Sequence, residues 1–336
     1  RLPRRATLLG AAFVFGLAHL APFAVDGYAA QVSGRVVAAV ACATYWAVAA
    51  VIATRIAGPE RTARAMAVLV GGLTLANVVG VPAGTWIGGT FGWQAAFVAV
   101  AVATAGVMVL LRSLIPVLPD ARTALPMREL VRSETRVFRD RRLWLALATT
   151  ASFQAAVFCA FSYLAPLLTG VAALPGAYVP LVLLLFGVGT FVGVTIGGRY
   201  ADRDMLANVM ISLAAMVLAL LILAALAGSR VGAVIAVFVL GATAFSIAAA
   251  LNGRVFAFAG DAPTLAAAVN VTAFNVGNAV GPWLGGVVLG AGLGLRAPVW
   301  TGALIGMVAL GFAATSWRVE RTDFTQDERE DHYVNE

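Results

Sequence analysis

The sequence contains no lysine, and all 23 of its basic residues are arginine. It is also poor in charge, since 12% of its residues are charged and 61% are hydrophobic. A soluble domain has about half of its residues apolar and about a quarter charged. A chain of 336 residues with this composition lacks the polar side chains that a soluble surface requires. Its excess apolar surface is therefore expected to face lipid.

Several kinds of functional site are also missing. The two cysteines, Cys42 and Cys159, lie midway along apolar runs without metal-ligand spacing, so they indicate neither a metal site nor a disulfide. The sequence has no nucleotide-binding loop, metal-ligand cluster or catalytic triad, which argues against an enzyme and against a cofactor. The net charge of +7 comes from short arginine clusters between apolar runs. That pattern is typical of membrane topology and not of nucleic-acid binding.

Ten long apolar runs dominate what is present. A membrane-spanning helix needs about 20 apolar residues to cross about 30 Å of hydrocarbon. The runs do not alternate as the strands of a transmembrane barrel do, so the sequence predicts an all-α integral membrane protein. The runs lie at about 7–25, 32–53, 65–88, 93–115, 143–168, 179–198, 206–227, 231–252, 264–290 and 296–317.

The arginines also predict how the chain is oriented. If the first residue is cytoplasmic, the loops alternate across the membrane and 20 of the 23 arginines fall on the cytoplasmic side. Only Arg35, Arg230 and Arg296 fall on the other side. Cytoplasmic loops are enriched in basic residues, so both ends of this chain are predicted to be cytoplasmic in a multi-pass protein of the plasma (cell inner) membrane.

A charged stretch at 117–142 divides the runs into four and six. Apolar residues recur in it at helical spacing, which favours an amphipathic helix on the cytoplasmic membrane surface; an exposed charged linker is an equally good interpretation. The predicted organisation is an incomplete helical bundle at 1–116, this linker, a six-helix bundle at 143–317 and a cytoplasmic tail at 318–336.

Two glycine ladders form an internal repeat. Glycine at every fourth position bares one helix face, so a neighbouring helix can approach closely, and the same glycines could instead govern bending. The first ladder lies in the third run and the second in the ninth, the fifth of its block. If the two blocks are equivalent, the first block lacks two helices. We therefore expect that the ten runs belong to a fold of twelve helices. The ladders are Gly80, Gly84, Gly88 and, offset by 197 residues, Gly277, Gly281, Gly285.

These motifs resemble those of a known family. The ladders look like the antiporter motif in the fifth and eleventh helices of the major facilitator superfamily. Arg35 opens RVVAAVACATYWAVAAV, which is similar to that family's arginine-bearing fourth helix, and Gly198-Arg-Tyr-Ala-Asp202-Arg203 matches the second-half copy of its helix 2–3 loop motif. Residues 61–97 and 252–286 resemble the branch of drug:proton antiporters that contains arabinose-efflux permeases and chloramphenicol-resistance exporters.

The resemblance implies a major facilitator-type bundle in which the first block supplies helices 3–6 of the family fold. It implies a secondary transporter that exports a small, partly apolar molecule, with a phenicol-type drug favoured, by proton antiport through alternating access. Its partners would be that substrate, protons and the lipid bilayer, and a monomer is expected. Two alternatives stay open. The protein could export a sugar or another metabolite. The chain could also be a transport-inactive fragment, because no Asp or Glu lies in the middle of any run and the acidic residue of the family's first helix is missing.

The resemblance assigns Arg35 to proton coupling, although Cys42, Tyr45 and Trp46 stand where small residues usually follow that arginine. The alternative is that Arg35 only anchors its helix at the membrane interface. Asp202 and Arg203 are expected to form a gate at the cytoplasmic face, or else are ordinary loop charges.

Substrate contacts are expected from polar and aromatic side chains near the middle of the bilayer. Gln154, Phe158 and Phe161 share one face of the fifth run, and Asn270, Phe274 and Asn278 share one face of the ninth. Each amide could equally serve as a hydrogen-bonding link between helices. His19 is expected to be a packed residue and not a proton relay. The predicted substrate residues are Tyr45, Asn77, Gln154, Phe158, Phe161, Asn270, Phe274 and Asn278.

Overall fold

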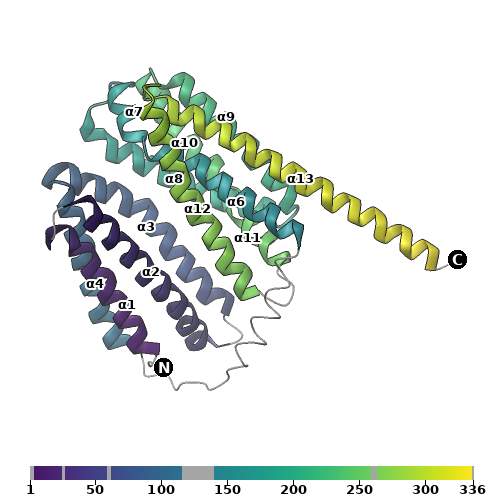
Figure 1. Ribbon diagram of the computed structural model, residues 1–336, viewed down its shortest axis with the longest axis horizontal. Coiled ribbons are helices and arrows are strands. Elements are labelled where there is room, and N and C mark those ends of the chain that lie inside the picture. Colours follow the sequence, from purple (N-terminus) through teal and green to yellow (C-terminus); the bar gives the residue numbers. More distant parts are fainter. Residues whose placement is uncertain (1–3, 25–26, 59–61, 116–139, 259–262, 335–336) are drawn as a thin grey trace. The chain divides into compact units, whose positions relative to one another are not determined.

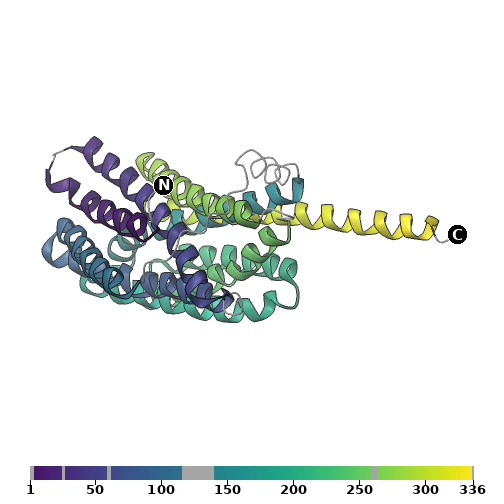
Figure 2. The same cartoon turned by 90° about the horizontal axis from the view of Figure 1, so that it is seen from below.

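The computed structural model describes residues 4–24, 27–58, 62–115, 140–258 and 263–334, and the regular elements in this part of the chain are all helices, without a strand. It divides into two compact units, residues 1–123 and 124–336 (Figures 1 and 2). Each unit is described by itself below.

Within the described residues, unit 1 contains four helices. They are α1 (Arg4–Ala24), α2 (Tyr28–Ala57), α3 (Thr62–Phe91) and α4 (Trp93–Leu114). The first helix packs against α2 and α4, and α3 also packs against α2 and α4. The contacts of α1 are made by small side chains, because Ala11, Ala12, Ala38 and Ala41 are buried together with Leu8.

Unit 2 contains the remaining helices. A pair formed by α6 and α12 packs against α13, and a second pair, α8 and α10, packs against α9 (Figure 1). The elements are α6 (Arg141–Phe161), α7 (Leu164–Gly170), the short 3-10 helix η3 (Gly176–Tyr178), α8 (Val179–Ala201), α9 (Met205–Leu226), α10 (Arg230–Phe245), α11 (Ala248–Ala257), α12 (Pro263–Gly290) and α13 (Ala297–Val334).

Every predicted apolar run lies on a helix. Two runs are interrupted: α6 gives way to α7 at residues 162–163, and α10 gives way to α11 at residues 246–247. Within the described residues, seven helical stretches are long and apolar enough to cross a membrane. The prediction of an all-α membrane fold is therefore confirmed, whereas the predicted amphipathic helix at 117–142 lies almost wholly outside the described residues.

The last helix is longer than the sequence pattern suggested. We expected the final run to end near residue 317, and α13 continues to Val334 (Figure 2). The stretch after 317 contains no Pro or Gly and is rich in Arg and Glu, so its local propensity sustains the helix after the apolar pattern ends. Apolar periodicity alone marks where burial stops and not where a helix stops.

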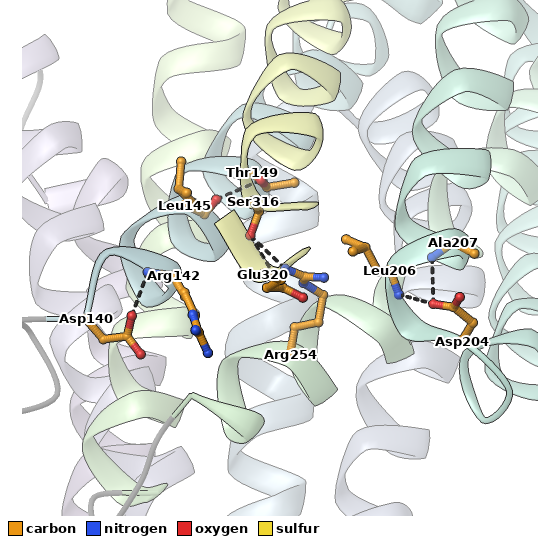
Figure 3. Close-up of polar contacts among 10 residues, drawn as sticks. All are labelled: Asp140, Arg142, Leu145, Thr149, Asp204, Leu206, Ala207, Arg254, Ser316 and Glu320. Carbon is orange, nitrogen blue, oxygen red and sulfur yellow. Dashed lines mark hydrogen bonds and ion pairs between the residues drawn. The ribbon is translucent and has the colours of Figure 1, made fainter. Parts of the chain in front are cut away.

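Side chains cap several helices of unit 2. The Asp140 carboxylate accepts a hydrogen bond from the backbone N–H of Arg142 at the start of α6 (2.7 Å). Asp204 accepts bonds from the N–H groups of Leu206 and Ala207 at the start of α9, both at 2.9 Å (Figure 3). These aspartates satisfy N–H groups that have no partner within the helix.

A glycine ladder that we did not predict joins α8 to α10. A Cβ atom on Gly193 would lie 2.1 Å from the carbonyl oxygen of Ala242, and one on Gly197 would lie 1.9 Å from that of Ser246. Gly189 precedes them by one turn and meets the Phe238 carbonyl in the same way. Backbone therefore packs directly on backbone along this seam, which only glycine permits.

Candidate functional site

The ladder of α12 packs on α6. A Cβ atom on Gly277 would lie 2.5 Å from the Ala151 carbonyl oxygen, and one on Gly281 would lie 2.4 Å from that of Ala155. The α6 residues that receive the ladder are themselves spaced by four and small, which brings the two backbones together. This close packing fixes the side chains that flank the seam.

The seam continues to an aromatic side chain at the end of α6. Gly285 leaves room for the ring of Tyr163, because a Cβ atom there would lie 2.5 Å from the ring. The Tyr163 hydroxyl donates a hydrogen bond of 2.8 Å to the carbonyl oxygen of Pro282. The interruption between α6 and α7 is thereby tied to the proline of α12.

Two of the predicted substrate residues meet across this seam. The Gln154 side-chain N–H donates to Oδ1 of Asn278 at 2.8 Å. Gln154 is only 6% exposed, and its Oε1 has no hydrogen-bond partner within the described part of the chain. A buried acceptor without a partner costs about 1–3 kcal/mol, so this oxygen is available to a donor on a bound molecule.

A second amide pair lies farther along α12. The Nδ2 group of Asn270 donates to Oδ1 of Asn252 on α11 at 2.8 Å. Asn270 is 2% exposed, and its own Oδ1 again has no partner among the described residues. On the face of α12 that they share, Asn270 therefore bonds to α11 and Asn278 bonds to α6. In each pair, one amide oxygen has no hydrogen-bond partner in the described part of the chain.

Aromatic rings accompany these amides. Phe158 and Phe161 of α6 have ring centroids 5.8 Å apart, and Phe161 contacts Phe186 of α8 at 4.6 Å. Phe186 contacts Phe245 of α10 at 6.2 Å. Phe153 completes the chain of rings by contacting Phe245 at 6.1 Å and Phe274 of α12 at 6.5 Å. Edge-on and tilted pairs of this kind present both ring faces and ring edges to a ligand.

The predicted coupling residue of unit 1 stacks on an aromatic ring. The guanidinium of Arg35 in α2 lies 4.3 Å from the centroid of the Phe97 ring in α4. His19 of α1 lies near the same ring, 6.0 Å between centroids, and its Nδ1 is hydrogen-bonded to the carbonyl of Phe15 at 2.8 Å. His19 is 8% exposed and bound to its own helix, as expected of a packed residue.

The remaining predicted residues of unit 1 lie on α2 and α3. Tyr45 is half-buried on α2, and Asn77 lies on α3, where its side chain is outside the described part of the structure. The α3 ladder also differs from that of α12. Among the described atoms, nothing would lie within 4 Å of a Cβ on Gly80 or Gly84, and a Cβ on Gly88 would reach only the Trp93 backbone at 3.9 Å.

At the loop between α8 and α9, the predicted gate is not a direct pair. Asp202 ends α8 and Arg203 follows it, and both side chains are exposed. Within the described residues, no hydrogen bond or ion pair joins them; Arg203 instead lies 6.0 Å from the Tyr200 ring. The gating role of these two residues stays a prediction.

A charged cluster that the sequence did not single out lies nearby. Arg254 of α11 forms an ion pair with Glu320 of α13 and donates a hydrogen bond of 2.8 Å to the Ser316 hydroxyl (Figure 3). The Arg254 side chain is 7% exposed and that of Glu320 is 20% exposed. Sequence analysis treated Glu320 as part of the cytoplasmic tail at 318–336, because the apolar run ends at 317 and gives no sign that the helix continues.

Sequence analysis also missed Phe153, Phe186 and Phe245. Each lies in an apolar run where a phenylalanine is expected from lipid contact alone, so no local signal separates them from lipid-facing rings. Across the described residues, His, Cys, Asp and Glu form no group that could hold a metal ion. The amides of unit 2 can accept hydrogen bonds from a ligand, and its phenylalanine rings can contact one.

The chain is similar in sequence to known membrane proteins. Residues 1–272 match the family described as the Major Facilitator Superfamily. A "Chloramphenicol resistance protein" of Streptomyces lividans is 36% identical over 308 residues, covering 92% of this chain and 78% of that protein. The "Inner membrane transport protein YdhP" of Escherichia coli K12 is 33% identical over 308 residues, covering 91% and 78%.

One solved structure extends the comparison to the fold. It is a bacterial homolog of the human lysosomal transporter Spinster in an inward-facing, unoccupied conformation, with a TM-score of 0.71. The likeness covers 95% of this chain and 84% of that one at 18% sequence identity. At that identity it establishes a shared fold and nothing about substrate.

Proposed function

The chain belongs to the major facilitator superfamily, and from this premise we propose that it exports a small, partly apolar molecule by proton antiport through alternating access. A phenicol-type drug is the favoured substrate. The similarity to a chloramphenicol resistance protein supports this choice, and the side chains along the α6–α12 seam match the chemistry of such a molecule.

The observation that carries the proposal is the pair of unsatisfied amide oxygens beside the aromatic rings. Gln154 Oε1 and Asn270 Oδ1 are both buried and lack partners within the described residues. They suit the hydroxyl and amide N–H groups of a neutral drug, and Phe158, Phe161 and Phe274 suit its ring. We assign Gln154, Phe158, Phe161, Asn270, Phe274 and Asn278 to substrate contact on this ground. Substrate contact by Tyr45 and Asn77 of unit 1 stays a prediction.

We further propose that the arginine-rich loops are cytoplasmic and that the protein lies in the plasma membrane with both ends of this chain inside the cell. The proposed organisation keeps residues 1–116 and 143–317 as two helical bundles joined by 117–142. In this arrangement Arg35 serves proton coupling from the outer end of α2. Asp202 and Arg203 form the cytoplasmic gate, and the glycine ladders hold the helices that move.

The proposal is tested by drug accumulation. The chain is expressed in a chloramphenicol-sensitive strain, and the uptake of radiolabelled chloramphenicol is measured with and without a protonophore. Expression should lower accumulation, and the protonophore should restore it. Gln154→Leu should weaken this effect, and the control Leu218→Ala, which truncates a 57% exposed side chain on α9 and not on α6 or α12, should keep it.

Two results would contradict the proposal. Unchanged accumulation of phenicols and of sugars alike would exclude export by this chain. Lowered accumulation that a protonophore leaves unaltered would exclude proton antiport while keeping export.

A further inference from the structure

Unit 1 contains a buried histidine that none of the proposed substrate contacts uses. His19 lies within the apolar helix α1 and is 8% exposed. The described residues of this unit include no Asp or Glu. Proton-coupled transport requires a side chain within the membrane that gains and loses a proton. His19 is the candidate in this part of the chain, because histidine ordinarily changes its charge between about pH 5 and pH 8.

One ring nitrogen of His19 is already bonded. Nδ1 lies 2.8 Å from the carbonyl oxygen of Phe15. A carbonyl oxygen only accepts hydrogen bonds, so Nδ1 carries the hydrogen and Nε2 of the neutral ring carries the lone pair. Within the described residues, Nε2 has no hydrogen-bond partner. The bond to Phe15 therefore fixes the tautomer in which Nε2 accepts a proton.

The neighbouring helix α2 comes very close to α1 beside this histidine. A Cβ atom on Gly34 would lie 3.1 Å from the Ala18 carbonyl oxygen and 3.1 Å from the Cβ atom of Ala21. Glycine at position 34 therefore allows the two backbones to approach where α1 carries His19. Since Arg35 directly follows Gly34, this contact sets the point at which the arginine leaves α2.

His19 and Arg35 contact the same aromatic ring. The Arg35 guanidinium lies 4.3 Å from the centroid of the Phe97 ring, and the centroid of the His19 ring lies 6.0 Å from it. The Phe15 ring lies 4.4 Å from His19 on α1 itself. Aromatic rings attract cations, so Phe15 and Phe97 can stabilise a charged His19. A second positive charge beside Phe97 repels the guanidinium already there.

The other charged groups of these helices lie far from this ring. Helix α1 packs on α2 and α4, and each remaining described arginine of the three helices lies about 20 Å or more along its helix from His19, Arg35 or Phe97, at 1.5 Å per residue. These arginines are Arg4 and Arg5 on α1, Arg55 on α2 and Arg112 on α4. The other titratable groups are Tyr28, Cys42 and Tyr45 of α2. Thiols and phenols are ordinarily uncharged at neutral pH, so Arg35 is the charge that a protonated His19 meets.

We propose that Nε2 of His19 is the proton-binding site of unit 1 and that Arg35 responds to its charge at the Phe97 ring. A proton from water on the outer side adds to the Nε2 lone pair and converts the imidazole to imidazolium. The new N–H bond later breaks, and the proton leaves to water on the cytoplasmic side. The imidazolium repels the guanidinium from the shared ring, and deprotonation allows it to return. This assignment rests on the proton antiport of the proposed function.

The first test detects the proton without transport. The chain contains two histidines, so carbon-13 labelling of histidine in a His332→Asn background leaves the signal of His19 alone. In nanodiscs, that signal should change between the two forms of the ring as the pH is raised from about 5 to about 8. A signal that keeps one form throughout this range, in protein that is folded by circular dichroism, would overturn the proposal.

The second test determines whether that proton drives export. His19→Asn keeps a side-chain N–H for the Phe15 carbonyl and removes the nitrogen that takes the proton. In proteoliposomes, this variant should lose chloramphenicol efflux driven by an imposed pH gradient and keep chloramphenicol exchange at equal pH. The matched control His332→Asn should behave as wild type in both assays. The titration uses an unaltered His19, so it decides the proposal even if His19→Asn does not fold.

Substitution of the shared ring tests the response of Arg35. Phe97→Leu removes the aromatic face and should flatten the pH dependence of efflux, whereas Phe97→Tyr keeps that face and should preserve it. Identical pH profiles in wild type and Phe97→Leu would show that the ring does not link Arg35 to the proton.

The outcomes separate this inference from the proposed function. Gradient-driven efflux that is the same in wild type and His19→Asn would overturn the inference and leave proton antiport in place. Asp26 lies between α1 and α2, outside the described residues, and loss of the gradient response in Asp26→Asn alone would assign the proton to that carboxylate. Absence of gradient-driven efflux in wild type would contradict the proposed function, and the titration would still decide whether His19 binds a proton.

Discussion

Gly281 of α12 packs against the carbonyl oxygen of Ala155 on α6 so closely that a Cβ atom would lie 2.4 Å from that oxygen. Its repeat counterpart in unit 1, Gly84, has no described atom within 4 Å of the same position. The two glycines stand 197 residues apart in equivalent motifs and therefore form a matched pair.

Gly281→Ala should destabilise the protein, and Gly84→Ala should not. The new methyl group at 281 forces the two helices apart, and overpacking of this kind costs about 1–3 kcal/mol. At 84 the higher helix propensity of alanine favours the variant by up to about 1 kcal/mol. Thermal unfolding in detergent, where 1 kcal/mol shifts Tm by about 2–4 °C for domains of 150–250 residues, measures the difference. Equal shifts for the two variants would show that the ladders are packed alike.

Removal of the amide link should weaken substrate binding more than folding. Gln154→Leu deletes both the bond to Asn278 and the unsatisfied oxygen, so the KM for chloramphenicol should rise several-fold if that oxygen contacts the drug. An interhelical bond in a membrane contributes about 0.6 kcal/mol, so Tm should fall by only a few degrees. Tyr163→Phe removes another hydrogen bond between α6 and α12 without changing a proposed substrate residue, and serves as the control. A rise in KM of the same size in both variants would assign the effect to the loss of an interhelical bond alone.

Arg35→Lys should lose most of the proton-coupled transport although it keeps the charge. The guanidinium stacks on Phe97 at 4.3 Å, and an ammonium on a flexible stem does not reproduce that planar contact. The contact itself is worth about 0.5–1 kcal/mol at an exposed site, so stability should barely change. The measurement is drug efflux driven by an imposed pH gradient in proteoliposomes. Arg230→Lys is the control for a general effect of replacing an arginine. Full activity in Arg35→Lys would show that Arg35 only anchors its helix at the membrane interface.

The Arg254–Glu320 pair should contribute to the stability of unit 2. Glu320→Gln leaves a buried guanidinium without its carboxylate, and the loss should lie toward the lower end of the about 3–5 kcal/mol seen when one partner of a buried pair is removed, because Glu320 is 20% exposed. The double variant Arg254→Gln with Glu320→Gln should recover part of this loss. Chemical unfolding of the single and double variants gives the coupling free energy, and additive losses would show that the two charges act independently.

The sequence predicted the positions of all ten apolar runs because burial in lipid imposes one strong rule, an unbroken apolar stretch of about 20 residues. It also placed the second glycine ladder on the ninth run, but it did not predict that Gln154 bonds to Asn278. It missed the ladder of α8, where Gly189, Gly193 and Gly197 have the same spacing as the others. This spacing is visible in the sequence, but we predicted ladders only where two of them formed an internal repeat.

Other features could not have been predicted from local patterns. The ring contacts of Phe186 and Phe245 join helices whose separation along the chain is large, and one phenylalanine in an apolar run resembles another. The ion pair of Arg254 with Glu320 spans 66 residues and depends on α13 continuing past its apolar part. Pairings of this kind are set by helix packing, which periodicity does not encode.

The direct backbone contact between α8 and α10 has a mechanical consequence. A seam lined by side chains can adjust to small shifts by changing rotamers, but carbonyl groups set against glycines have no such freedom. We therefore expect α8 and α10 to move together as one rigid body, and α6 and α12 to do the same. Within the described part of unit 2, bending is therefore expected outside these two seams. Stiffening such a place should slow conformational exchange while both seams stay as they are.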